Sequence, residues 1–181
     1  MKRSSSFVAE LAGATIGGTF NQYGDSELRR TRLAYYLDLR AGAPILLVGE
    51  AAGYRGARVS GIPFTSERQL TGAGPGEASA TIVHRVLVEL GLTEHVLLWN
   101  LVPTHPGTAT SNRRPTRAEI RAARPYLELL AAEREVVAVG RLAQAELGGE
   151  YVRHPARGGA AAFRAGLLRF RAGALARAVF L

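Results

Sequence analysis

Three short apolar runs constrain the fold of this chain more than any other feature of its sequence. They are PILLVG at 44–49, HVLLWN at 95–100 and EVVAVG at 135–140. Continuous apolar runs of this length are typical of strands covered on both faces, because a half-exposed strand alternates apolar and polar residues. A shorter run, YVRHP at 151–155, is also interpreted as a strand. The pattern predicts a buried, mainly parallel sheet of four strands.

Helical patterns alternate with these strands, at 25–42, 76–91, 116–133, 140–149 and 158–181. The third begins with Thr116 and Glu119 in the spacing of a capping box. Alternating strands and helices predict a layered α/β domain. Since the 181 residues contain no internal repeat or linker, we expect a single domain over 1–181, with residues 1–6 as a flexible tail.

The chain is basic, and nearly all of its positive charge comes from arginine. Lys+Arg 23 against Asp+Glu 15 gives a net charge of +8, and Lys2 is the only lysine. Arginine binds phosphate in a bidentate manner and stacks on bases, so one interpretation is polyanion binding. The other is the Ala/Gly/Arg-rich composition that a GC-rich genome produces. Charge alone does not decide between them.

The chain has no cysteine, which excludes disulfides, thiolate metal sites and cysteine-ligated iron–sulfur clusters within it. No apolar run is long enough to span a bilayer, and Glu10 interrupts the short apolar stretch near the start, so no signal peptide is expected. We therefore expect a cytoplasmic monomer with no cofactor, no metal and no membrane partner.

Polar residues stand where the predicted strands end. Glu50, Asn100 and His154 occupy these places, and ligands of parallel α/β sheets bind beyond the carboxyl ends of the strands. Taken singly, each has a simpler interpretation, namely a turn cap, a turn amide and a solvent-exposed ring. Because all three depend on one topology, together they predict a shared polar site.

The segment after the first strand favours a planar, anionic ligand. Gly49 leaves bare backbone beside Glu50, and Phe64 follows a proline in a loop, where an aromatic ring is usually either a hydrophobic plug or a stacking platform. Arg55 and Arg58 lie between them. A nucleotide fits this combination.

Four motifs resemble the uracil-DNA glycosylase superfamily in their order and spacing: GEAAGYRG at 49–56, GIPFTSE at 61–67, LLWN at 97–100 and RHPARGG at 153–159. The resemblance runs from about Pro44 to Gly159. It implies a three-layer sandwich around a central, mainly parallel four-stranded sheet. It also implies a DNA partner and hydrolysis of the N-glycosidic bond of uracil in base excision repair.

The resemblance assigns a role to each matching residue. Glu50 would position or deprotonate the attacking water, and His154 would stabilise the charge that develops on the leaving base. The implied substrate-binding residues are Gly49, Ala51, Phe64, which stacks on the extruded base, and Asn100, which reads its edge.

The first motif departs from the superfamily at three positions. Ala52 replaces the proline of the closest branch, while Ala51 and Gly53 replace an aspartate and a tyrosine of the better-known branch. Without the aspartate the chain depends on Glu50 for the water. Without the tyrosine, its means of rejecting the methyl group of thymine stays open. The iron–sulfur cluster of the nearest branches cannot be ligated without cysteine.

Contacts with DNA are expected from arginines at five positions: Arg55, Arg58, Arg113, Arg114 and Arg157. Arg157 stands near the place of the superfamily's minor-groove wedge, which is often a leucine. Without an apolar wedge, extrusion of a base from well-paired duplex should be weak. We therefore expect the substrate to be single-stranded or mismatched DNA. Lys2 is a poor candidate for a Schiff-base amine, so the reaction should stop at the abasic site.

Two alternatives stay open. Hypoxanthine presents the same donor and acceptor order as uracil to the Asn100 amide, so the substrate could be another deaminated base such as hypoxanthine or xanthine. The second alternative is a catalytically idle nucleic-acid-binding or nucleotide-binding module on the same fold, because the aspartate of the better-known branch is missing.

Overall fold

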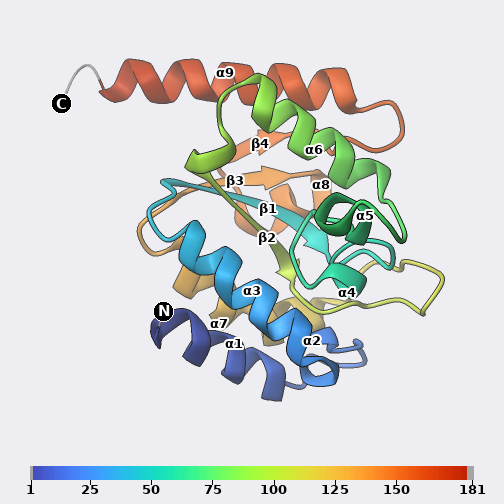
Figure 1. Cartoon of the computed structure of the whole chain (residues 1–181). Coiled ribbons are helices and arrows are strands. Elements are labelled where there is room, and N and C mark those ends of the chain that lie inside the picture. Colours follow the sequence, from blue (N-terminus) through green and yellow to red (C-terminus); the bar gives the residue numbers. More distant parts are fainter. Residues whose placement is uncertain (1, 179–181) are drawn as a thin grey trace.

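A four-stranded sheet lies at the centre of the structure, a computed structural model that describes residues 2–178 (Figure 1). The strands are β1 (Ile45–Ala51), β2 (Val96–Val102), β3 (Glu135–Val139) and β4 (Glu150–Val152). Their order is β2-β1-β3-β4, and all neighbours are parallel. The predicted three-layer α/β fold with a parallel four-stranded sheet is confirmed.

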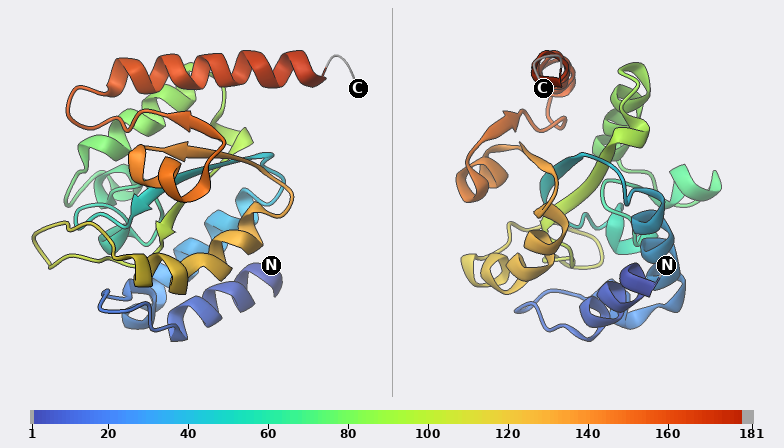
Figure 2. Two further views of the ribbon diagram at one scale, coloured as in Figure 1. Left: turned by 180° about the vertical axis from the view of Figure 1, so that it is seen from behind. Right: turned by 90° about the vertical axis from the view of Figure 1, so that its left-hand side faces the viewer.

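Helices cover both faces of this sheet. Figures 1 and 2 show α3 (Glu27–Leu39) and α6 (Ala78–Glu89) on one face, with α7 (Arg117–Ala131) and α8 (Arg141–Leu147) on the other. α9 (Ala160–Ala178) packs along β4, and α1 (Lys2–Gly13) packs against α3. The connections carry the short helices α2 (Gln22–Asp25), α4 (Ala57–Ser60) and α5 (Glu67–Thr71) and the 3-10 turn η1 (Thr93–His95).

The two central strands bring their carboxyl ends together. All seven residues of β2 and the first five of β1 are buried, as their continuous apolar sequences predict. Gly49 pairs in register with Asn100, and Ala51 pairs with Val102. The polar residues that the sequence places near these strand ends are therefore neighbours in space.

The prediction of a flexible tail at residues 1–6 is wrong for residues 2–6, which begin α1. Ser4 Oγ donates a hydrogen bond to Asp38 Oδ1 of α3 at 2.6 Å, and the Phe7 ring packs edge-on against Trp99 at a centroid distance of 5.7 Å. Val8 and Leu11 are buried. Packing of this apolar face orders the segment despite its polar first residues. Met1 lies outside the described residues.

Other boundaries shift by a few residues. The helix expected at 158–181 runs from 160 to 178, and its last three predicted residues lie outside the described residues. The capping box is confirmed: Thr116 Oγ1 accepts from the Glu119 N–H at 3.2 Å, and a Glu119 carboxylate oxygen accepts from the Thr116 N–H at 2.8 Å. The strand expected at 151–155 ends at Val152, so His154 lies in the following loop.

Candidate active site

At Gly49 the backbone of β1 lies against two side chains of the pocket, those of Asn100 and Phe64. A Cβ atom on this glycine would lie 2.9 Å from Asn100 Oδ1 and closer still to the Phe64 ring. Any side chain at position 49 would displace the amide or the ring. The glycine that ends the first predicted strand is thus required by close approach.

Asn100 is buried inside the sheet rather than at the end of its strand. β2 continues for two residues beyond it, because Val102 pairs with Ala51 of β1. The residue is only 3% exposed, and its carboxamide borders the pocket. Strand pairing on the β1 side fixes the backbone from which this amide projects.

Phe64 has a backbone conformation that residues other than glycine rarely adopt. Its φ is +52°, and the residue is 8% exposed. Left-handed backbone at a bulky residue is strained and persists only where the surrounding structure enforces it. The ring is therefore held in the pocket wall against a local cost.

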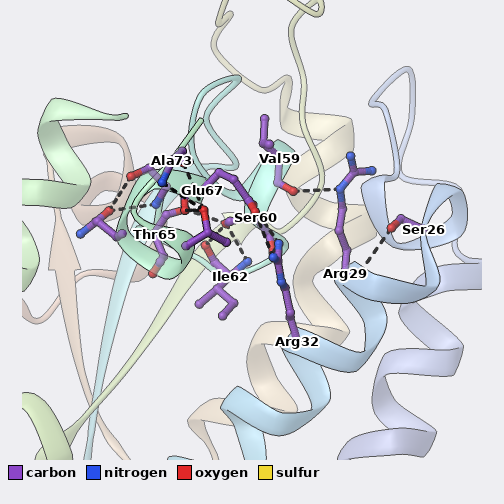
Figure 3. A network of polar contacts seen from close by, with 12 residues as sticks. Ser26, Arg29, Arg32, Val59, Ser60, Ile62, Thr65, Glu67 and Ala73 are labelled. Atoms are coloured by element: carbon purple, nitrogen blue, oxygen red, sulfur yellow. Dashed lines mark hydrogen bonds and ion pairs between the residues drawn. The ribbon is translucent and has the colours of Figure 1, made fainter. Parts of the chain in front are cut away.

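Side chains of α3 provide part of this enforcement (Figure 3). Arg29 Nε donates to the Val59 carbonyl oxygen at 3.0 Å. Arg32 forms a bidentate pair with the Glu67 carboxylate at 2.8 and 2.9 Å. Within the loop, Ser60 Oγ donates to the Thr65 carbonyl at 2.6 Å. These contacts fix both ends of the segment at 59–67, which carries Phe64.

His154 presents a neutral ring with a defined tautomer. Its Nδ1 accepts a hydrogen bond from the Ala156 N–H at 3.1 Å, so the proton of the neutral ring is on Nε2. Burial lowers the pKa of His154 below its ordinary value, because desolvation disfavours the imidazolium. The side chain therefore offers the pocket an N–H donor without a net charge.

Glu50 is a half-buried carboxyl on β1. Burial raises its pKa, and the positive charge of Arg114 acts in the opposite direction. Arg114 is itself exposed. The pKa of Glu50 therefore depends on the burial of its carboxyl group and on the charge of Arg114.

These groups line one pocket with a cavity volume of about 170 Å³. Six predicted site residues form part of its wall: Glu50, Ala51, Phe64, Asn100, Arg113 and His154. Gly49 lies against two of them. The wall does not include four of the predicted arginines, namely Arg55, Arg58, Arg114 and Arg157.

The arginines predicted to bind DNA differ in what they contact. The guanidinium of Arg58 lies 4.9 Å from the Phe20 ring centroid, and that of Arg55 lies 5.5 Å from the Tyr54 ring centroid. Arg157 is exposed, with a φ of +53°. Arg113 is held by the Glu119 carboxylate at 2.6 and 2.9 Å, which restricts where its charge can reach.

The pocket wall also contains residues that sequence reasoning missed. Ser79 and Glu77 come from the start of α6, whereas Pro106 and Asn112 come from the long loop at 103–115. Asn112 Oδ1 accepts from the Tyr54 N–H at 2.9 Å and so joins this loop to the first motif. Loop length was the one available signal, since the sequence does not indicate which loop side chains point inward.

The Arg113–Glu119 pair leads to a stability prediction. Hydrogen bonds from Arg113 lower the pKa of Glu119 to about 2, and the Glu119 side chain is 3% exposed. A Glu119→Gln variant should lose about 2–3 kcal/mol of unfolding free energy at pH 7. Because the folded-state pKa is depressed, this contribution is present above the ordinary pKa and disappears as the pH falls towards 2.

Urea unfolding at pH 7 and at pH 3 measures this effect. Glu128→Gln is the matched control, since Glu128 lies on the same helix with a 66% exposed side chain, and it should change stability by less than about 0.5 kcal/mol. Equal stability of Glu119→Gln and the parent protein at pH 7 would show that the pair contributes nothing net.

No group of three or more His, Cys, Asp or Glu side chains in the described part of the chain is arranged to hold a metal ion. Among the same residues, no helix combines the length and the apolar character needed to cross a membrane.

Comparisons with known proteins agree with the fold. A family model described as the Uracil DNA glycosylase superfamily matches residues 38–173. The crystal structure of wild-type Pedobacter heparinus SMUG2 matches with a TM-score of 0.67 at 13% sequence identity, over 96% of this chain and 97% of that one. No curated protein matches the sequence. The range matched by the family model includes every residue of the pocket wall.

Proposed function

Because the chain belongs to the uracil-DNA glycosylase superfamily, whose members are DNA glycosylases, we propose that it hydrolyses the N-glycosidic bond of uracil in DNA. The observation that carries this proposal is the convergence of Asn100, Phe64, His154 and Glu50 on one small pocket. An aromatic face, a base-reading amide, a neutral N–H donor and a carboxyl can together bind a flipped base and assist cleavage of its glycosidic bond.

Asn100 and Phe64 recognise the extruded base. The carboxamide offers one donor and one acceptor, which complement O4 and N3–H of uracil. Cytosine reverses this order, and the mismatch leaves a buried polar group unpaired, at about 1–3 kcal/mol. Stacking on the Phe64 ring replaces part of the stacking lost on flipping.

His154 and Glu50 act on the breaking bond. As the bond lengthens, the base gains negative charge and the sugar gains positive charge. The Nε2–H of neutral His154 donates to O2 of the base and stabilises the developing oxyanion. The Glu50 carboxylate orients or deprotonates the water that attacks C1′, and its charge favours the cationic sugar.

The product is an intact strand with an abasic site. Strand cleavage by a glycosylase proceeds through an amine that forms a Schiff base. Lys2 is the only lysine, and it lies in α1, which packs against α3 rather than at the pocket. The reaction therefore ends at hydrolysis.

A cleavage assay tests the proposal. Labelled oligonucleotides containing one uracil, hypoxanthine or xanthine are incubated with the protein, and alkali then converts abasic sites to breaks. Breaks at uracil that appear only after alkali are the expected result. Breaks at a purine alone would identify another deaminated base as the substrate. Binding without breaks at any of the three bases would identify an idle module.

Arg157 sets the preference for the form of DNA. Base extrusion from duplex costs a few kcal/mol, and less from a mismatch or a single strand. Arg157 is exposed, has a left-handed backbone and is followed by Gly158 and Gly159, so it is a weak substitute for an apolar wedge. We expect single-stranded uracil and U·G to be cleaved faster than U·A, and we expect Arg157→Ala to widen that difference.

Single-turnover rates on the three substrates at matched salt measure this preference, because counterion release affects duplex and single strand differently. Arg153→Ala, which replaces another exposed arginine just after β4, provides the comparison. Cleavage of U·A as fast as single-stranded uracil would place the wedge elsewhere in the chain.

A further inference from the structure

Glu77 is a carboxyl in the pocket wall that the proposed reaction does not use. It is the N-cap residue of α6, yet its side chain makes no capping hydrogen bond. The carboxyl instead lies against the first-motif loop. A Cβ atom would be 3.1 Å from Glu77 Cδ if it were built on Gly53, and 2.9 Å from it if it were built on Gly56. Bare backbone at these two positions makes room for the carboxyl.

The Glu77 carboxylate is poorly satisfied in the free protein. Among the described residues, none donates a hydrogen bond to it or pairs with it as a cation. Burial raises its pKa, since little water remains to solvate the charge. A ligand group that removed the remaining water without offering a hydrogen bond would add to this cost.

The edges of a bound uracil limit what Glu77 can face. This step rests on the proposed function, in which Asn100 reads N3–H and O4, His154 reaches O2, and Phe64 covers the ring face. The C5–C6 edge is then left, and it carries only hydrogens in uracil, whereas thymine has a methyl group at C5. Of the large polar wall residues without a role, Arg113 is held by the Glu119 carboxylate and Asn112 by the Tyr54 N–H, whereas the Glu77 carboxyl has no such partner in the described part of the chain.

We propose that the Glu77 carboxyl faces C5 of the bound base and excludes thymine. A methyl group there would displace water from an unpartnered carboxyl and occupy space that its oxygens already fill. Hydrogen at C5 avoids both penalties. Discrimination by one methyl group in a pocket amounts to about 10–200-fold in rate, which is useful to an enzyme that meets far more thymine than uracil in DNA.

The test compares excision from U·G and T·G duplexes under single-turnover conditions. Glu77→Ala removes the carboxyl and should raise excision of thymine by about 10–200-fold while uracil excision continues. Glu77→Gln keeps the bulk and a polar group, so it should still reject thymine. Uracils with fluorine or bromine at C5 extend the test, because the parent protein should slow as the substituent grows, whereas Glu77→Ala should follow leaving-group ability.

The control is Glu128→Ala, since Glu128 is an exposed carboxylate of α7, and it should match the parent protein on every base. Continued rejection of T·G by a Glu77→Ala variant that still cleaves U·G would overturn the proposal. So would loss of U·G cleavage in a variant with an unchanged thermal unfolding midpoint, since Glu77 would then act in the reaction itself. Failure of the parent protein to cleave U·G would instead overturn the proposed function.

Discussion

A His154→Ala variant is expected to excise uracil about 10²–10³-fold more slowly than the parent protein, because removal of one preorganised donor to a developing oxyanion lowers the rate by this factor. Affinity for DNA should change little, since phosphate contacts supply most of it. The prediction depends on the Nε2–H donor that the Ala156 N–H selects by occupying Nδ1. Asn100→Ala should show the same separation of excision from binding, because its amide also acts on the flipped base.

Single-turnover excision rates and binding titrations on one uracil-containing oligonucleotide measure both quantities. His95→Ala is the matched control, because His95 is exposed and precedes β2 at the end of the strand away from the pocket. It should behave as the parent protein. Equal losses of binding and excision in His154→Ala would show that the ring binds DNA rather than stabilising the charge that develops on the leaving base.

A Glu50→Gln variant is expected to slow the chemical step by about 10²–10⁴-fold with nearly unchanged affinity, since it removes a charge and a base but keeps the shape. The pH profile provides a second signature. Because burial raises the pKa of Glu50, the carboxylate is lost on acidification at a higher pH than an ordinary glutamate would require. Excision by the parent protein should therefore fall as the pH drops through that raised value, and Glu50→Gln should lack this acid limb.

Arg114 provides a matched test of the same assignment. Its charge acts to lower the pKa of Glu50, so Arg114→Ala should move the acid limb to still higher pH. Arg117→Ala, which removes another exposed arginine nearby in the sequence, should leave the limb in place. A limb that is the same in Glu50→Gln and the parent protein would mean that another group positions the water.

The sheet could be predicted from sequence because its signal is local. Continuous apolar runs that end in glycine or asparagine located β1, β2 and β3 to within two residues at each end. The strand predicted at 151–155 instead spans Glu150–Val152. Only Val152 is buried in it, so no continuous apolar run marks its ends. The start of α1 was missed because its order comes from contacts with Asp38 and Trp99, which lie far away in the sequence.

The pocket was only partly predictable for the same reason. Glu50, Asn100 and His154 lie within two residues of the carboxyl ends of parallel strands, so one topological rule brings them together. Glu77 lies in the pocket wall because its carboxyl packs against Gly53 and Gly56. This contact spans a long loop, so the hydrophobic periodicity of the sequence does not predict it. The pairing of Arg113 with Glu119 is equally hidden, because it joins a loop to the first turn of a helix.

The contacts that several arginines make within the protein have a consequence for how this chain binds a polyanion. Arg29, Arg32 and Arg113 direct their guanidinium groups to carboxylates or carbonyls of the protein itself. Each such group is already neutralised or committed, and it displaces few counterions when a nucleic acid binds. The salt dependence of binding should therefore reflect fewer phosphate contacts than the total of 23 Lys and Arg residues suggests. These three arginines therefore support the fold of the protein in addition to carrying positive charge.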